Sequence, residues 1–200
     1  MPQPDPLQPD PHRPDPTQPA TVEILDSTSA LTPTALTWLH DQAAAALGLM
    51  HITGELRARV VGDAEMAALH VHHTGIEGTT DVLTFDLRDT PPQPTDSAYG
   101  SIVFVIDTDI VVCLDEARRH AGPGGYPVEH ELLLYLVHGV LHCIGHDDHA
   151  EDQALAMHAE EDRILRALGV GAVYSRGSGG ADGSQRSGGT DSAHGGGTPG

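Results

Sequence analysis

The chain has 200 residues and a formal net charge of −19 at pH 7, and all ten of its basic side chains are arginines. This excess of acid opposes loose binding to nucleic acid, which depends on many contacts between Lys or Arg and phosphate. No stretch approaches the roughly 18 apolar residues that a membrane-spanning helix needs, so no membrane association is expected. Two isolated cysteines, Cys113 and Cys143, predict reduced thiols and a cytoplasmic location.

Composition divides the chain into one folding unit and two tails. Residues 1–20 hold eight of the 15 prolines, and residues 175–200 hold ten of the 23 glycines. Both compositions are typical of disordered segments, and the first has neither the basic nor the apolar region of a signal peptide. We therefore expect a disordered Pro-rich tail over 1–20, one domain over 21–174 and a disordered Gly/Ser-rich tail over 175–200.

Hydrophobic periodicity predicts that strands and helices alternate along this domain. Strands are expected at 21–25, 55–61, 79–85, 101–106 and 109–114, the last two forming a hairpin-like pair around 107–108. Helices are expected at 33–47, 64–70, 115–121, from 127 to a stop at 145, and at 150–168, with a loop at 86–98. This order favours an α+β fold with a small mixed β-sheet packed with helices.

Residues 138–149 read His-Gly-Val-Leu-His-Cys-Ile-Gly-His-Asp-Asp-His, and this segment predicts a metal site. His138 and His142 stand four apart, which places both imidazoles on one face of a helix, close enough to hold one ion. Residues 131–137 before them are apolar enough for a buried helix, where unpaired imidazoles would be costly.

A third ligand can follow the helix. Gly145 offers a helix stop, because glycine enters the left-handed conformation cheaply, and the chain can then turn back towards the metal. Asp148 and His149 are the two candidates, and the spacing does not decide between them. Three protein ligands leave a fourth position for water, as in catalytic zinc sites. Such a water, activated by the metal, can attack a phosphodiester or an amide.

The residue at position 139 bears on the reaction class. In HExxH peptidases the glutamate directly after the first histidine is the general base, but Gly139 stands there in this chain. Phosphodiester hydrolysis needs less from a dedicated base, because much of its catalysis is charge neutralisation and positioning. The motif therefore favours a phosphodiesterase over a peptidase.

The pattern His-Gly-x-Leu-His-x-x-Gly-x-Asp over 138–147, preceded by Thr-Asp-Val-Leu-Thr-Phe over 80–85, resembles the YbeY family of bacterial endoribonucleases and rRNA maturation factors. The resemblance covers roughly residues 22–170. It implies a single-strand-specific endoribonuclease with one zinc ion in a cleft, acting in 16S rRNA 3′-end maturation and ribosome quality control. It also implies rRNA and the small ribosomal subunit as partners, with no DNA. On the same basis, Thr80 and Asp81 are expected to line the cleft and support the site.

The end of the motif departs from the family pattern. The usual third ligand of the family is a histidine, in the order Gly-Tyr-Asp-His. Aligned without gaps, Asp148 falls on that position and His149 comes one residue later. Aspartate is a competent zinc ligand, so position favours Asp148, whereas ligand type favours His149.

A second departure concerns a cationic side chain. The family often carries an arginine shortly before its Thr-Asp motif, and Thr74 stands in that place here. If catalysis is retained, cationic help must come from other residues, of which the candidates are His70, His72, His73, Arg57 and Arg59. A non-catalytic, metal-stabilised ribosome-assembly factor is therefore the alternative function.

Overall fold

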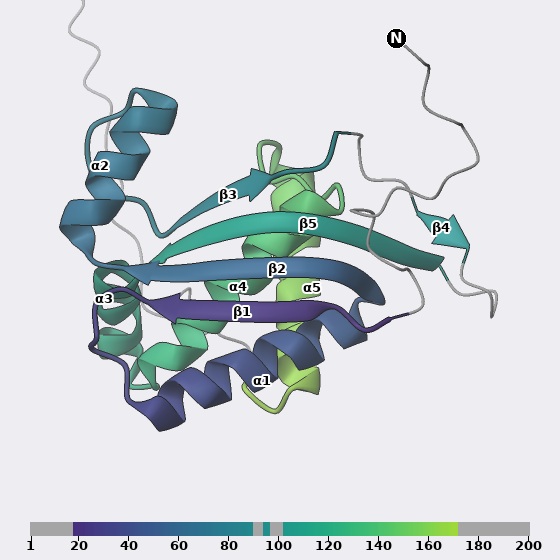
Figure 1. The fold of residues 1–200 in the computed structure, drawn as a ribbon, viewed down its shortest axis with the longest axis horizontal. Coiled ribbons are helices and arrows are strands. Elements are labelled where there is room, and N and C mark those ends of the chain that lie inside the picture. Colours follow the sequence, from purple (N-terminus) through teal and green to yellow (C-terminus); the bar gives the residue numbers. More distant parts are fainter. Residues whose placement is uncertain (1–17, 90–93, 97–101, 172–200) are drawn as a thin grey trace, which may run out of the picture.

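The fold is a mixed β-sheet with helices stacked on one face, seen in a computed structural model that describes residues 18–89, 94–96 and 102–171 (Figure 1). Its strands are β1 (Thr21–Asp26), β2 (Ile52–Val61), β3 (Val82–Asp86), β4 (Thr95–Asp96) and β5 (Ile102–Cys113). Its helices are α1 (Pro33–Leu49), α2 (Asp63–Thr74), α3 (Leu114–Gly124), α4 (Val128–Cys143) and α5 (Glu151–Ala167). The predicted α+β class is confirmed, whereas residues 1–17 and 172–200 lie outside the described residues, so the two disordered tails stay predictions.

The sheet has the strand order β1-β2-β5-β3. β1 and β2 are parallel, β2 and β5 are parallel, and β3 runs antiparallel to β5. The short β4 pairs with the first part of β5. β5 is therefore the most extensively paired strand, and β3 lies beside it at the end of this order.

The predicted hairpin-like pair at 101–106 and 109–114 is wrong, because Ile102–Cys113 form the single strand β5. Asp107 and Thr108, which resemble a turn in the sequence, lie inside this strand and find partners there. The Asp107 carboxylate accepts from the Arg57 guanidinium at 2.5 Å, and the buried Thr108 hydroxyl donates to the Phe85 carbonyl at 3.0 Å. Polar residues can stay within a strand when neighbouring strands satisfy their hydrogen bonds.

Helix α4 lies at the centre of the core. It contacts α1, α3 and α5 as well as strands β5 and β3. Every residue from Glu131 to Cys143 is buried except His138 and His142, which are partly exposed. A helix that is buried at all positions but these two must be enclosed by other elements, and its two imidazoles then mark where it meets solvent. Both cysteines are buried and free of disulfide bonds, as predicted.

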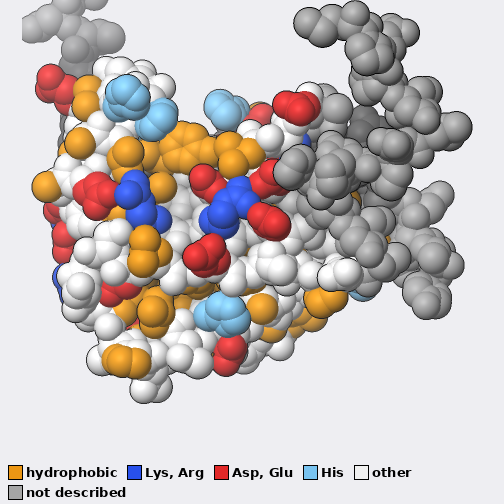
Figure 2. All heavy atoms as spheres, viewed as in Figure 1, with side chains coloured by type: hydrophobic (Ala, Val, Ile, Leu, Met, Phe, Trp, Pro, Cys, Tyr) orange, Lys and Arg blue, Asp and Glu red, His pale blue; other side chains and the backbone are white. Residues whose placement is uncertain are grey.

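The described helices leave the opposite face of the sheet largely uncovered. Along β2, Glu55, Arg57 and Arg59 alternate with the buried residues Leu56 and Ala58, because successive side chains of a strand point to opposite faces. Figure 1 shows α2 at one end of this face, α4 and α5 behind the sheet, and α1 along the lower edge beside β1. Figure 2 shows that basic side chains on the uncovered face lie among acidic ones. None of the helices in the described part of the chain is long and apolar enough to cross a membrane.

Candidate metal site

A cleft of about 480 Å³ lies between strand β3 and helix α4. It brings together residues from three separate parts of the chain: the segment before β3, the second half of α4, and the turn after α4. All six residues that the sequence predicted for the site line this cleft, namely Thr80, Asp81, His138, His142, Asp148 and His149. These residues converge because β3 pairs antiparallel with β5 and α4 packs against both strands.

The two imidazoles on α4 meet at their Nε2 atoms. The Nε2 atoms of His138 and His142 lie 3.0 Å apart, and the rings are edge-to-face at a centroid distance of 4.6 Å. Two ligands of a tetrahedral zinc ion with bonds of about 2.0–2.1 Å lie about 3.3 Å apart. The spacing of the two nitrogen atoms is therefore close to what one shared ion requires.

The chain turns back after α4 in the way that the sequence predicted. Gly145 has a φ of 99°, and the N–H of His146 donates to the carbonyl of Leu141 at 3.0 Å. The N–H of Gly145 donates to the carbonyl of His142 at 3.1 Å, which completes a Schellman motif at the helix end. This motif aims the following residues back along the helix and brings Asp148 to the imidazoles.

Asp148 completes a group of three donors with the two histidines. Its carboxylate oxygens lie 3.9 Å from Nε2 of His138 and 4.0 Å from Nε2 of His142. One potential ligand atom from each of the three residues lies within 4.8 Å of the others. A movement of about 1 Å by the Asp148 side chain would bring its oxygen to the donor separation of a tetrahedral zinc site.

The far nitrogen of each imidazole is already engaged. Nδ1 of His138 donates to the Glu161 carboxylate at 2.7 Å, and Nδ1 of His142 donates to the His146 carbonyl at 3.1 Å. Carboxylate and carbonyl oxygens accept hydrogen bonds, so in the neutral rings the proton resides on Nδ1 and the lone pair on Nε2. Two lone pairs then face each other at 3.0 Å. A shared cation removes that repulsion, so this donor set fits a metal ion.

The acidic surroundings of His138 change its proton affinity. Burial lowers its pKa, but the hydrogen bond to Glu161 and the negative charges of Glu161, Asp81 and Asp148 outweigh burial. The pKa of His138 in the metal-free protein is therefore raised above its ordinary value. The same negative charges that favour a proton here also favour a metal cation.

His149 takes a different position from the other candidate ligands. Its side chain is 87% exposed, and its Nδ1 donates to the carboxylate of Asp147. Hydrogen bonds from the ring and backbone of His149 and from the backbone of Asp148 hold the pKa of Asp147 below its usual range. Asp147 thus stabilises the turn, and the geometry groups Asp148, not His149, with the two histidines of α4.

Thr80 and Asp81 form the wall of the cleft before β3. The Asp81 carboxylate accepts from the Thr80 hydroxyl at 3.0 Å and from the backbone N–H of Val82 at 2.9 Å. The Asp81 carbonyl accepts from the N–H of Cys113 at 2.8 Å, which ties this segment to β5. The position of the Asp81 carboxylate is therefore set by the sheet itself.

Gly139 faces the sheet from within α4. A Cβ atom there would lie 2.6 Å from Oγ1 of Thr84 on β3 and 2.8 Å from Cδ1 of Ile110 on β5. The absence of a side chain allows α4 to approach the sheet this closely. The position that carries the general base in HExxH peptidases is thus closed to a side chain unless the helix or the side chains of Thr84 and Ile110 shift.

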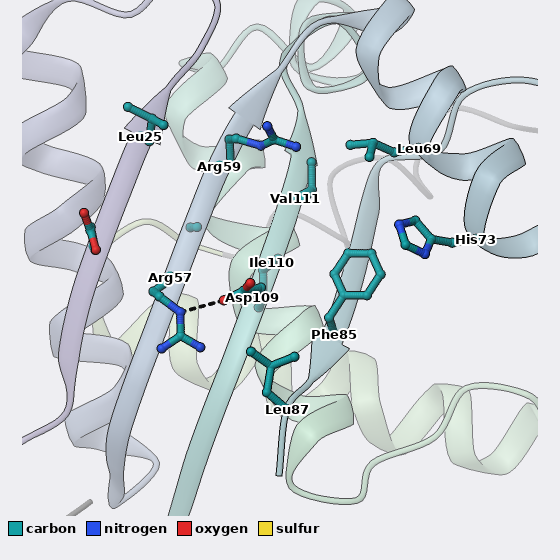
Figure 3. Close-up of a pocket in the computed structure, with 12 residues that line it drawn as sticks. Leu25, Arg57, Arg59, Leu69, His73, Phe85, Leu87, Asp109, Ile110 and Val111 are labelled. Carbon is teal, nitrogen blue, oxygen red and sulfur yellow. Dashed lines mark hydrogen bonds and ion pairs between the residues drawn. The ribbon is translucent and has the colours of Figure 1, made fainter. Parts of the chain in front are cut away.

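The arginines that could take the place of the family's cationic side chain lie away from the cleft. Thr74 ends α2, where its hydroxyl donates to the His70 carbonyl at 2.7 Å. Arg57 and Arg59 line a second hollow, of about 490 Å³, on the uncovered face of the sheet (Figure 3). Arg57 is held there by Glu55, Asp107 and Asp109 at 2.5–2.6 Å, and Arg59 pairs with Glu65 at 2.9 Å.

The histidines of α2 also lie outside the metal cleft. His73 contacts Phe85 edge-to-face at a centroid distance of 4.7 Å, and Figure 3 shows the two rings beside the second hollow. His70 donates through Nδ1 to the Gly78 carbonyl at 3.0 Å. Among the described residues, His70, His72 and His73 belong to no group of three donors that could hold an ion.

Two residues of the site region were not found from the sequence. Glu161 occupies a buried position on the stripe of α5 that also includes Met157 and Leu165, and a carboxylate on such a stripe is a signal that could have found it. Arg88, with a side chain only 12% exposed, donates to the carbonyls of Val105 and Cys143 and pairs with Asp86. No sequence pattern indicates that a side chain will contact the backbone carbonyls of residues 17 and 55 positions away.

Comparisons with known proteins agree with the motif. A family model described as Endoribonuclease YbeY matches residues 21–169. A protein of Frankia alni named Endoribonuclease YbeY is 35% identical over 146 residues, which cover 73% of this chain and 77% of that protein. One of Halorhodospira halophila with the same name is 39% identical over 121 residues, 60% of this chain and 75% of its own. A solution structure of TM1509 from Thermotoga maritima has a TM-score of 0.47 at 20% identity and covers 83% of this chain and 100% of its own.

Proposed function

The chain belongs to the YbeY family of endoribonucleases, and on this premise we propose that it is a zinc-dependent endoribonuclease that cleaves single-stranded RNA. The proposed ligands of one zinc ion are His138, His142 and Asp148. One observation carries the proposal: the Nε2 atoms of His138 and His142 converge at 3.0 Å while both Nδ1 atoms are already hydrogen-bonded. We assign the activity to the domain over residues 21–174.

The residues of the cleft have distinct parts in this reaction. When bound, a zinc ion supplies Lewis acidity at a phosphate and lowers the pKa of a water molecule. Glu161 and the His146 carbonyl hold the two imidazoles so that their lone pairs point into the cleft. Asp81 lines the same cleft in a fixed position, where its carboxylate oxygens can accept a proton during hydrolysis.

The charge of the cleft supports a single-stranded substrate. Three aspartates, Asp81, Asp86 and Asp148, line the cleft, and none of the described residues that line it is an arginine. Attraction for phosphate must then come from the ion, which can attract one exposed phosphate but offers no broad basic surface for a duplex. We propose that the substrate is the 3′ end of 16S rRNA and that the reaction takes place in the cytoplasm. The small ribosomal subunit would present this RNA during its maturation and during ribosome quality control.

A second function deserves a direct test because of one observation. Thr74, at the position where the family often carries an arginine, is the last residue of α2, and Arg57 and Arg59 are paired with acids on the uncovered face. A cleft without a cationic side chain stabilises the developing phosphate charge less. The alternative is therefore a non-catalytic ribosome-assembly factor whose fold the metal stabilises.

Cleavage of labelled RNA by the purified full chain tests the proposal. The unaltered chain loaded with zinc should cut a single-stranded oligonucleotide and spare its duplex, and a chelator should abolish the reaction. The double variant His138→Ala/His142→Ala should lose on the order of 10³-fold in rate, because the metal supplies several kcal/mol of stabilisation. The matched control is His72→Ala/His73→Ala, which removes two neighbouring imidazoles from α2 and should cleave normally.

Two outcomes would overturn the nuclease proposal. Cleavage that persists in the His138→Ala/His142→Ala variant would come from another site or a contaminant. A zinc-loaded chain that cuts no RNA but sediments with 30S particles, whether or not the metal ligands are present, would establish the assembly factor instead.

A further inference from the structure

The carboxylate of Glu161 is buried between two imidazoles. Its side chain on α5 is only 2% exposed. Oε1 accepts from Nδ1 of His138 at 2.7 Å, and Oε2 accepts from Nδ1 of His158 at 2.9 Å. Glu161 thus connects a side chain of the metal cleft on α4 with a second imidazole one turn earlier on its own helix.

This arrangement determines which nitrogen of His138 is free. An ionised carboxylate only accepts hydrogen bonds, so the His138 proton resides on Nδ1 and the Nε2 lone pair points towards His142 and Asp148. A buried carboxylate is costly unless it is hydrogen-bonded and its charge is offset. Both oxygens of Glu161 are bound by imidazoles, and a cation at the far side of His138 would offset its charge through the ring.

We propose that Glu161 is a positioning residue that sets the tautomer and orientation of His138 for metal binding, and that His158 holds Glu161 in place. The inference rests on the proposed function, since it deepens the metal site assigned there. The second histidine of the site, His142, is oriented differently, by the carbonyl of His146. Only one of the two histidine ligands therefore depends on a side chain from another helix.

The substitution Glu161→Leu removes the acceptor shared by the two imidazoles. It leaves the Nδ1 groups of His138 and His158 without that partner, so the Tm of the metal-free chain should fall, and zinc affinity is measured at a temperature where the variant is folded. It removes the acceptor for Nδ1 of His138, and loss of such a partner typically weakens metal binding about 10–100-fold. Glu161→Gln restores an acceptor oxygen, so it should recover part of the affinity.

The adjacent residue offers a matched control. Asp162 is also buried on α5, and its carboxylate pairs with Arg166 at 2.8 Å. Asp162→Leu removes the same charge from the same helix and should leave zinc affinity unchanged within error. The affinities are measured on the full chain by competition with a chromogenic chelator, without RNA.

A second readout needs no metal. Long-range 1H–15N NMR spectra of the metal-free chain report the tautomer of each imidazole, and His138 should carry its proton on Nδ1. Glu161→Leu should shift this equilibrium towards the Nε2–H form, whereas Asp162→Leu should not. If Glu161→Leu fails to fold, His158→Leu tests the same contacts from His158 through Glu161 to His138, because it removes only the donor to Oε2 of Glu161. The zinc affinity of His158→Leu should fall, though less than that of Glu161→Leu.

The two proposals can fail separately. A Glu161→Leu variant that is folded, binds zinc as tightly as the unaltered chain and keeps the Nδ1–H tautomer would overturn the role of Glu161. Unchanged zinc affinity in His158→Leu would overturn the role of His158. If the unaltered chain binds no zinc but its His138 tautomer depends on Glu161, the metal site is wrong while the positioning contact stands.

Discussion

Substitution of Gly139 by alanine probes the closest approach between the metal helix and the sheet. The new Cβ would lie 2.6 Å from Oγ1 of Thr84 and 2.8 Å from Cδ1 of Ile110. Ordinary carbon contacts have optimal distances of about 3.5–4.0 Å, so α4 must move away from β3 and β5 by roughly 1 Å, or the two side chains must leave their rotamers. Either response disturbs the contact on which the cleft is built.

The magnitude follows from two opposing terms. Overpacking of a dense core costs about 1–3 kcal/mol. Replacing glycine by alanine inside a helix gains about 0.5–1 kcal/mol. Gly139→Ala should therefore lower the free energy of unfolding by up to about 2.5 kcal/mol. Displacement of α4 should also weaken zinc binding, since His138 and His142 flank this position.

Gly48→Ala is the control for the helix term. Gly48 lies in α1, and a Cβ atom there would meet nothing within 4 Å, so the same substitution should stabilise by about 0.4–1 kcal/mol. Because the helix gain is common to both variants, the difference between them isolates the clash, at about 1–3 kcal/mol. Urea denaturation of the metal-free proteins measures both values. A Gly139→Ala variant as stable as Gly48→Ala would refute the close packing of α4 on the sheet.

Three further predictions concern the ligands and the sheet. Asp148→Ala removes a proposed ligand, so it should weaken zinc binding by more than the roughly 10–100-fold that loss of a ligand's hydrogen-bond partner costs. His149→Ala should bind zinc normally. Competition with a chelator measures both affinities, and the reverse result would make His149 the ligand. A proton and a zinc ion compete for His138, and the pKa of His138 is raised above the ordinary imidazole value of about 6.5. Zinc affinity should therefore begin to fall at a pH above about 6.5 as the pH is lowered. Titration calorimetry that finds the same affinity from about pH 6 to 8 would contradict this. In the metal-free chain the same shift stabilises the fold below about pH 6.5, and this contribution is lost as the pH rises through the folded-state pKa. Gly54→Ala should cost about 3 kcal/mol or more, measured by thermal unfolding, because Gly54 has a φ of 101° and a Cβ atom would meet the backbone of Ile106; near-normal stability would show that β2 can shift.

Local sequence patterns were sufficient for the parts of the site that lie on one helix. The four-residue spacing of His138 and His142 requires that they share a face wherever the segment is helical. Gly145 was predicted to end that helix, and its φ of 99° agrees. These features depend on hydrogen bonds within one turn of backbone, so neighbouring residues determine them.

Strand β5 shows where local patterns fail. Asp107 and Thr108 have the composition of a turn, yet they lie in the middle of a strand because Arg57 from β2 and the Phe85 carbonyl from β3 bind them. Their partners are 50 and 23 residues away in the chain. A pattern of neighbouring residues carries no information on such partners, so the hairpin prediction was wrong.

The sequence by itself determined the paired histidines, the helix stop, the family motifs and the strand-and-helix order outside β5, because each follows from backbone periodicity or from residues close together in the chain. Only the tertiary structure decided that Asp148 joins the histidines while His149 turns to Asp147, that Glu161 from α5 binds His138, and that Arg57 lies on the other face of the sheet. Each of these depends on how separate elements pack, and packing brings together side chains whose distance along the sequence is unrelated to their distance in space.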